Sequence, residues 1–337
     1  MTEALLQIKD LEVRYATRAG LVRAVDGVDL EVRRGETLGL VGESGCGKST
    51  LGFSILRLIR PPGEIVGGQI FFGGEDLLQK TEQEMIHVRG KRIAMIFQDP
   101  MTCLNPLQRI DDHFIETVRT HEKGVSAREA RQRAADLMNK LGIIAGRLMD
   151  YPHQLSGGMR QRVMIGLALA LNSDLIIADE PTTSLDVIVE AQILELMKGL
   201  KRDFSLTMIL ITHNMGIVAE LADRIAVMYA GKLVEVAEAV DLYDEPLHPY
   251  TQGLLKSIPN ISLEEQKLET MPGSPPDLIE PPTGCRFHPR CPYAMEKCSA
   301  IEPPMREVEN GHRAACWLYL RSQKRENERQ PGRGPWP

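Results

Sequence analysis

A glycine-rich segment near the N-terminus carries the residue types that bind phosphate groups. It follows the apolar run 37–41 and reads Gly42-Glu43-Ser44-Gly45-Cys46-Gly47-Lys48-Ser49-Thr50. Glycines let successive backbone N–H groups turn inward around an anion, and the N-terminus of a following helix adds a positive dipole end. In such a strand–loop–helix unit, Lys48 reaches the phosphates and the Ser49 hydroxyl coordinates Mg²⁺. We therefore predict a nucleotide site, with binding residues Gly42, Ser44, Gly45, Cys46, Gly47, Lys48, Ser49 and Thr50; the Cys46 thiol itself is expected to be tolerated and not catalytic.

Two adjacent carboxylates follow a second apolar run, residues 175–178. Open α/β sheets bind ligands at the carboxyl ends of their strands, and Asp179 and Glu180 would stand at that edge. We expect Asp179 to join the Mg²⁺ shell and Glu180 to polarise the attacking water as a general base. For this segment alone, a buried strand with an acidic turn would be the preferred interpretation. Beside a phosphate-binding loop it is not.

Further polar motifs occur along the chain in a characteristic order. They are Gln98 in Ile96-Phe97-Gln98-Asp99-Pro100, the run Leu155-Ser156-Gly157-Gly158-Met159-Arg160-Gln161, Ser184-Leu185-Asp186, and His213 in Ile211-Thr212-His213-Asn214. With these motifs, residues 5–240 resemble the ABC-type ATPases. The resemblance implies that Tyr15 stacks on the adenine of ATP, that Gln98 contacts Mg²⁺, and that Gln98 and His213 assist Glu180 in catalysis. It also implies nucleotide contacts from Asp186 and from Ser156, Gly157 and Gly158, the last three toward the nucleotide held by an opposite subunit.

Local features narrow the resemblance to the dipeptide and oligopeptide importer ATPases. They are the run 95–106, Tyr151-Pro152-His153-Gln154, and His248-Pro249-Tyr250. Cys103 departs from the family, which more often has Ser there. The Met159 that follows the two glycines is similar to the D-type ATPase of this family. The resemblance then implies an F-type ATPase partner, two membrane permease subunits and an extracytoplasmic solute-binding protein, with this chain peripheral on the cytoplasmic face of the cell (inner) membrane.

The elements that must position these residues follow from apolar patterning. Strands alternate with helices over residues 1–240, which is typical of a largely parallel α/β sheet. Ser126 and Glu129 have the spacing of a capping box, and an apolar helical face follows up to Gly142. This patterning predicts an α/β fold with a helical subdomain inserted at about residues 101–160, and the resemblance implies that the fold is a P-loop NTPase of ABC type. A C-terminal extension would occupy residues 241–320, and we expect a disordered tail over 321–337.

Composition excludes several classes of protein. The 337 residues are 43% hydrophobic and 26% charged, with a net charge of −6, so a basic nucleic-acid footprint is missing and no nucleic-acid partner is expected. No apolar run reaches the roughly 20 residues that span a bilayer, and the N-terminus lacks a signal-peptide pattern. Two alternatives of other classes stay open at this stage. One is a soluble ABC ATPase acting on ribosomes or DNA, and the other is a redox enzyme using its cysteines.

Four of the six cysteines crowd into a proline-rich zone. Between Cys285, Cys291, Cys298 and Cys316 lie 5, 6 and 17 residues, and ten of the 21 prolines fall between 259 and 304. Prolines exclude long helices and central strands, so this zone needs another stabiliser. Structural zinc favours ligand pairs two to four residues apart, whereas a four-iron cluster takes one thiolate per iron and suits wider spacing. We predict a structural 4Fe-4S cluster, as in some ATPases of the resembling family, with zinc second and free or disulfide-linked thiols third.

Overall fold

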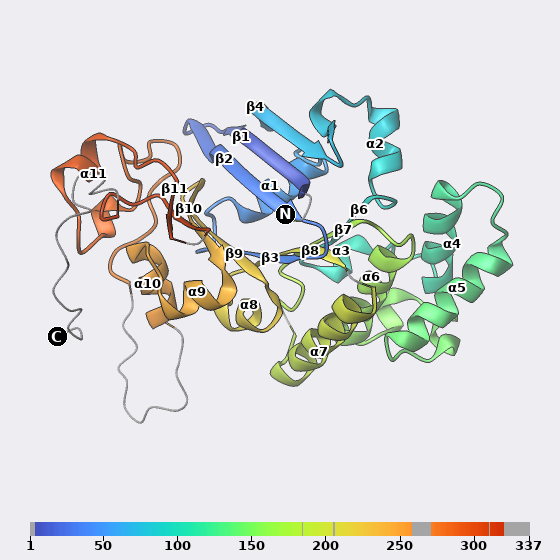
Figure 1. Ribbon diagram of the computed structural model, residues 1–337. Coiled ribbons are helices and arrows are strands. Elements are labelled where there is room, and N and C mark those ends of the chain that lie inside the picture. The colour runs from blue at the N-terminus through green and yellow to red at the C-terminus, as the bar shows by residue number, and fades with distance from the viewer. Residues whose placement is uncertain (1–3, 184, 205, 258–270, 310, 320–337) are drawn as a thin grey trace.

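A computed structural model describes residues 4–183, 185–204, 206–257, 271–309 and 311–319. The larger sheet has the strand order β11-β12-β10-β9-β3-β8-β7-β6, and its centre from β9 to β6 is parallel (Figure 1). Its strands are β3 (Thr37–Val41), β6 (Ile93–Ile96), β7 (Leu175–Asp179), β8 (Thr207–Thr212), β9 (Arg224–Tyr229), β10 (Lys232–Glu238), β11 (Arg306–Glu309) and β12 (His312–Ala314). Both apolar runs predicted as strands beside the site are confirmed as β3 and β7.

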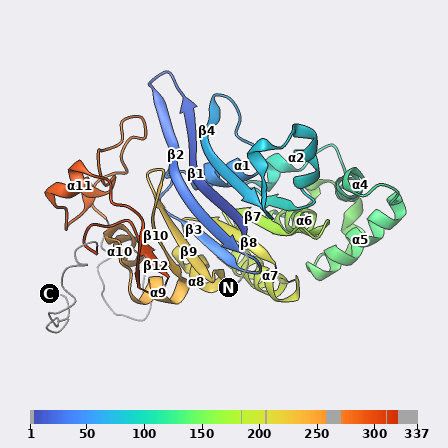
Figure 2. The same ribbon diagram turned by 45° about the horizontal axis from the view of Figure 1, so that its top comes forward.

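A second sheet is antiparallel, which differs from the predicted continuous parallel pattern. Its order is β2-β1-β4-β5, from β1 (Ala4–Ala16), β2 (Leu21–Arg33), β4 (Gly63–Phe72) and β5 (Glu75–Asp76). The turn 17–20 that joins β1 to β2 is too short for a parallel crossover, which needs a dozen or more residues. Figure 2 shows this sheet lying over β3, β7 and β8. Helix α1 (Lys48–Ile55) lies between the two sheets, where Leu51 and Ile55 share one apolar core with both.

Helices gather at one end of the molecule, as predicted for residues 101–160. They are α3 (Pro100–Cys103), α4 (Ile110–His121), α5 (Ala127–Lys140) and α6 (Gly157–Leu169), with α2 (Glu82–Val88) before them and α7 (Val187–Phe204) after β7. Helix α8 (Met215–Leu221) lies elsewhere and packs against β3 and β9 (Figure 1). The Ser126 hydroxyl accepts the Glu129 N–H at 3.1 Å, as the capping box predicted, while the Glu129 carboxylate pairs with Arg133. Gly142, with φ +73°, follows the end of α5. Helices α4–α7 pack one apolar core against β6, β7 and β8.

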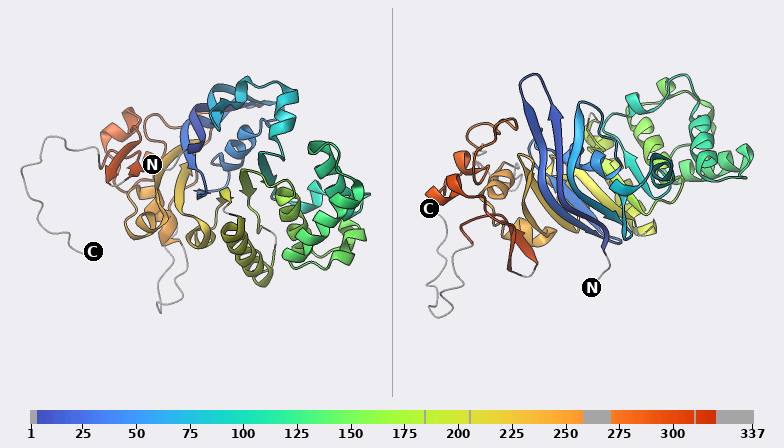
Figure 3. Two further views of the ribbon diagram at one scale, coloured as in Figure 1. Left: turned by 45° about the vertical axis from the view of Figure 1, so that its right-hand side comes forward. Right: turned by 90° about the horizontal axis from the view of Figure 1, so that it is seen from above.

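The C-terminal extension lies at the other end (Figure 3). After α9 (Ala239–Asp244) and α10 (Pro249–Lys256), its described part is mostly loops with the short helix α11 (Glu296–Ala300), as the prolines predicted. Strand β12 pairs with β10, so the extension adds to the edge of the larger sheet. Among the described residues, no helix is long and apolar enough to cross a membrane. The predicted tail at 321–337 lies outside the described residues, and the domain boundaries stay a prediction.

Candidate functional site: a nucleotide pocket at the carboxyl edge of the sheet

The glycine-rich loop connects β3 to α1 and has a backbone that only glycine fits at two positions. Gly42 (φ +154°) and Gly47 (φ +108°) would each bring a Cβ within 2.1 Å of a backbone carbonyl, that of Met228 and that of Ala24 respectively. The Lys48 ammonium donates to the carbonyls of Gly42 at 2.8 Å and Glu43 at 3.0 Å. The loop backbone therefore packs closely against Met228 and Ala24, and the Lys48 ammonium lies within the loop. This arrangement fits a bound phosphate group.

Two of the three predicted magnesium ligands, Ser49 and Asp179, are in direct contact. The Ser49 hydroxyl donates to Asp179 Oδ1 at 2.9 Å, and Asp179 is only 2% exposed. Burial raises the pKa of Asp179, and the neighbouring charge of Glu180 raises it further. A divalent cation beside these oxygens would supply the missing positive charge, so the donor set fits Mg²⁺.

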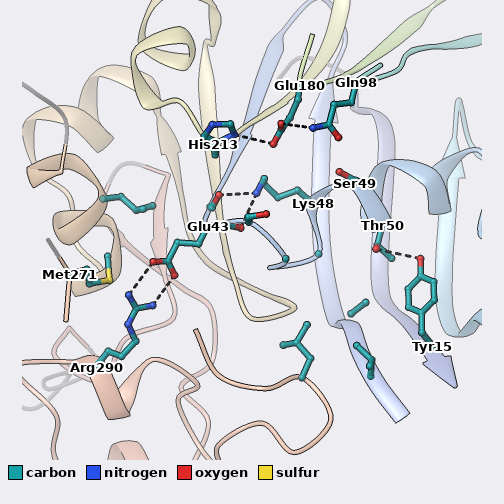
Figure 4. A pocket seen from close by; sticks show the side chains of 18 of the residues that line it. Tyr15, Glu43, Lys48, Ser49, Thr50, Gln98, Glu180, His213, Met271 and Arg290 are labelled. Atoms are coloured by element: carbon teal, nitrogen blue, oxygen red, sulfur yellow. Dashed lines mark hydrogen bonds and ion pairs between the residues drawn. The ribbon is translucent and has the colours of Figure 1, made fainter. Parts of the chain in front are cut away.

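Glu180 stands just beyond β7 in a left-handed backbone conformation, with φ +45°. Its carboxylate accepts a hydrogen bond from Gln98 Nε2 at 3.0 Å, and His213 Nδ1 lies 3.0 Å from its other oxygen (Figure 4). Thr183 Oγ1 also donates to this carboxylate, at 2.9 Å. Burial alone would raise the pKa of Glu180, but the hydrogen bonds from His213 and Thr183 outweigh it and lower the pKa. The three predicted catalytic residues thus meet, and Glu180 is held ionised, as a proton acceptor must be.

The pocket around these groups is an open cavity of about 820 Å³. Tyr15 lies at one side of it, with its hydroxyl 3.5 Å from Thr50 Oγ1 (Figure 4). The predicted residues that line it, besides Gln98, Glu180 and His213, are Tyr15, Gly42, Ser44, Gly45, Gly47, Lys48, Ser49 and Thr50. Cys46 is buried, and burial raises the pKa of its thiol.

Four predicted nucleotide contacts lie elsewhere in the chain. Ser156 caps α6 by accepting the Met159 N–H at 3.3 Å, and Asp186 accepts the Val189 N–H at 2.9 Å ahead of α7. Neither these two residues nor Gly157 and Gly158 line the pocket. Next to Asp186, Val187 and Ile188 are 84% and 72% exposed. Ser184 lies outside the described residues.

The four cysteines of the extension come close to one another. Burial raises the pKa of Cys285 to about 11 and that of Cys316 to about 12. The nearby thiols of Cys291 and Cys298 add to the rise in both cases. All six cysteines carry free thiols. Within the described ranges, however, no three His, Cys, Asp or Glu side chains are placed to hold a metal ion.

The extension also supplies a wall of the pocket that the sequence analysis missed. Arg290 binds the Glu43 carboxylate through two hydrogen bonds, of 2.7 and 3.0 Å, and the Tyr250 hydroxyl accepts the Glu43 N–H at 2.8 Å. Other lining residues from this region are Leu254, Ser257, Met271, Gly273 and Leu278. An arginine between two of the clustered cysteines was the available signal, but its partner is 247 positions away.

Comparisons with known proteins agree with this geometry. Residues 25–183 match the family described as ABC transporter, and residues 234–298 match Oligopeptide/dipeptide transporter, C-terminal region. The oligopeptide transport ATP-binding protein OppD of Bacillus subtilis is 48% identical over 93% of this chain and 88% of its own length. The dipeptide transport ATP-binding protein DppD of the same organism is 45% identical, over 94% and 95% of the two chains.

Among solved structures, a dimeric ATP-binding cassette in a post-hydrolysis state, bound to ADP and Pi, superimposes with a TM-score of 0.63 at 26% identity. It covers 69% of this chain and 98% of its own. The predicted ATPase fold of ABC type is therefore confirmed. The relatives' identity and coverage go further, because they extend through the C-terminal region. This chain belongs to the family of ATP-binding subunits of oligopeptide and dipeptide ABC transporters.

Proposed function

We propose that the chain is the ATP-hydrolysing subunit of a binding-protein-dependent importer for dipeptides or oligopeptides. The observation that carries the proposal is a set of contacts at one sheet edge: Ser49 donates to Asp179 at 2.9 Å, and Gln98 and His213 each lie 3.0 Å from the Glu180 carboxylate. Lys48 lines the same pocket. The names of the relatives, which are transport ATP-binding proteins for such peptides, support the solute class.

The residues divide the chemistry between binding and proton transfer. The loop N–H groups and Lys48 would hold the phosphates of ATP, and Tyr15 would face its base. Ser49, Asp179 and Gln98 would hold Mg²⁺, which would supply positive charge to the phosphates. Glu180 accepts the proton of the attacking water, while His213 and Gln98 keep its carboxylate aimed into the pocket. The pKa of Glu180 is lowered, so its carboxylate is ionised at neutral pH and has a free site for that proton.

The chain would work in an assembly at the membrane. We propose an F-type ATPase partner, two membrane permeases and an extracytoplasmic solute-binding protein, with this chain on the cytoplasmic face. Ser156, Gly157, Gly158 and Asp186 lie outside the chain's own pocket, which supports their contacting the partner's nucleotide. When the paired ATPase subunits close, the helical subdomain and the Gln98 loop would transmit this movement to the permeases.

The proposal extends to the four clustered thiols, which would hold a 4Fe-4S cluster as a structural staple. Its support is that neighbouring thiols of the cluster help to raise the pKa of Cys285, Cys291 and Cys316. Among the described residues, no three of these side chains are placed to hold a single ion. A four-iron cluster takes one thiolate per iron, so its ligands stand farther apart than those of one zinc ion. Zinc, reached by a small inward movement of the loops, is the alternative.

If the site is shared between two subunits, the isolated chain should have low ATPase activity, and this expectation tests the proposal. The isolated chain should bind ATP through Lys48 but hydrolyse it slowly, and adding the F-type partner with the permeases should raise turnover strongly. Ser156→Arg should lower turnover of the assembly while leaving ATP binding by the isolated chain unchanged. Full activity from a demonstrated monomer, independent of its concentration, would contradict the shared-site proposal. Binding of peptides to the solute-binding protein tests the solute class separately.

A further inference from the structure

An arginine of the C-terminal extension reaches the phosphate-binding loop across the pocket. The Arg290 guanidinium forms a two-pronged ion pair with Glu43, the residue after the first glycine of that loop (Figure 4). The Arg290 side chain is 6% exposed and that of Glu43 is 26% exposed. A bidentate, largely desolvated pair of this kind has a defined geometry, unlike a flexible surface pair.

Other contacts hold the Arg290 side chain in place from its own side. Its Nε donates to the Pro272 carbonyl at 2.9 Å, and a terminal nitrogen lies 3.3 Å from the Tyr229 hydroxyl. The guanidinium carbon also lies 5.8 Å from the ring centre of Tyr229 and 6.0 Å from that of Phe287. The guanidinium therefore stays fixed without contributions from solvent.

Glu43 is linked directly to the groups that hold phosphate. Its carbonyl accepts the Lys48 ammonium at 3.0 Å and the Cys46 N–H at 3.3 Å. Its N–H donates to the Tyr250 hydroxyl. A shift of Glu43 would consequently move an acceptor of Lys48 and the turn that follows.

We propose that Arg290 is a positioning residue of the nucleotide site, which sets the phosphate-binding loop by holding and neutralising Glu43. The inference rests on the proposed binding of ATP by that loop. It assigns to the extension a direct part in nucleotide affinity.

Charge predicts the direction of the effect. ATP brings several negative charges to the loop, and the Glu43 carboxylate is repelled by them unless a cation offsets it. Removing Arg290 leaves that carboxylate half-buried and uncompensated. Removing the carboxylate as well should therefore restore affinity, which a merely structural role of Arg290 would not produce.

The experiment measures equilibrium ATP binding to the full chain by calorimetry, with melting temperature recorded for each variant. We expect Arg290→Gln to weaken ATP binding about 10-fold and Arg290→Lys, which keeps the charge but loses the fork, about 3-fold. The double variant Glu43→Gln/Arg290→Gln should return to within about 3-fold of the wild-type affinity.

Arg286→Gln is the matched control, because Arg286 is equally buried in the same segment but binds Asp26 and the Ala230 carbonyl. Glu43→Gln should rescue nothing in that background. Wild-type affinity in a folded Arg290→Gln, or a double variant as weak as that single variant, would overturn the proposal. Lys48→Ala distinguishes failure of the proposed ATP binding from failure of the role of Arg290. If Lys48→Ala binds ATP with wild-type affinity, the proposed ATP binding by the loop is wrong, independently of the Arg290 results.

Discussion

The nucleotide pocket and the four-thiol cluster are positioned by different kinds of structure. In the pocket, Asp179 ends β7 and His213 follows β8, and these parallel strands are hydrogen-bonded side by side. In the cluster, Cys285 and Cys291 lie in loops and turns, and Cys298 lies in a helix of five residues. The pocket therefore has a rigid support of its own, whereas the thiols depend on loops and on each other.

This difference indicates in which of the two regions a bound ligand or metal group would be needed to stabilise the fold. Strands buried on both faces keep Asp179 and Glu180 in place because their backbone hydrogen bonds and apolar packing are complete without ATP. Loops rich in proline lack such a ladder, so a metal group that joins four thiols would replace it. Loss of a key residue should consequently abolish chemistry in the pocket, whereas in the extension it should lower thermal stability.

The largest expected effect is on chemistry, through Glu180→Gln. The amide keeps the shape of the side chain but cannot accept the proton, so ATP affinity should persist while turnover falls about 10²–10³-fold. Steady-state ATPase assays of the assembled transporter and ATP binding by calorimetry measure the two quantities. Glu220→Gln, which breaks only a surface pair with Lys198, should leave both unchanged. Near wild-type turnover in Glu180→Gln would remove this carboxylate from the role of base.

A second prediction separates the two regions through Cys291→Ser. Protein purified without oxygen should be brown, with about four irons and four sulfides per chain. The variant should lose the colour and melt at a lower temperature, because one ligand of the staple is gone. ATP affinity should fall by no more than about 10-fold, the effect expected for Arg290→Gln, because Lys48 and β7 are held by the loop and the sheet and not by the thiols.

Cys103→Ser is the matched control, because that thiol is exposed and far from the cluster in sequence. It should leave iron content and melting temperature unchanged. Colourless wild-type protein with one tightly bound zinc would replace iron by zinc as the staple. Loss of ATP binding in Cys291→Ser would contradict the independence of the two regions.

The smallest expected effect is a pH dependence confined to the extension. Burial lowers the pKa of His248 to about 4, only partly opposed by Glu235, and its Nδ1 accepts the Tyr250 N–H at 3.1 Å. The unfolded chain then binds more protons than the folded one below pH 6.5, so stability falls with falling pH. Between pH 7 and pH 5 the loss from this group is about 2 kcal/mol.

His248→Asn supplies the comparison, since asparagine can accept the same N–H but does not titrate. Thermal unfolding from pH 7 to pH 5 should show a weaker pH dependence in the variant than in the wild type. Glu180 should add nothing to the slope in this range, because its pKa is lowered from an already acidic value. Parallel slopes for the two proteins would show that His248 is protonated without cost.

Much of the pocket was determined by local sequence. The strand–loop–helix at residues 37–55 and the acidic end of β7 each depend on neighbouring residues, and the structure contains both. The periodicity of apolar residues and the positions of glycines indicate local backbone conformation and the buried face of each element. They predicted which side chains would reach the sheet edge, because parallel strands end together.

Tertiary structure alone decided the rest. The antiparallel sheet of β1, β2 and β4 follows from strand pairing between residues up to 66 positions apart, such as Leu6 and Phe72, which the alternation of apolar residues does not encode. The pairing of Arg290 with Glu43 joins positions 247 apart, and the approach of the four thiols depends on how β12 attaches to β10. Such contacts are set by the packing of whole elements, because only the folded chain brings distant segments within the few ångströms over which charges and hydrogen bonds act.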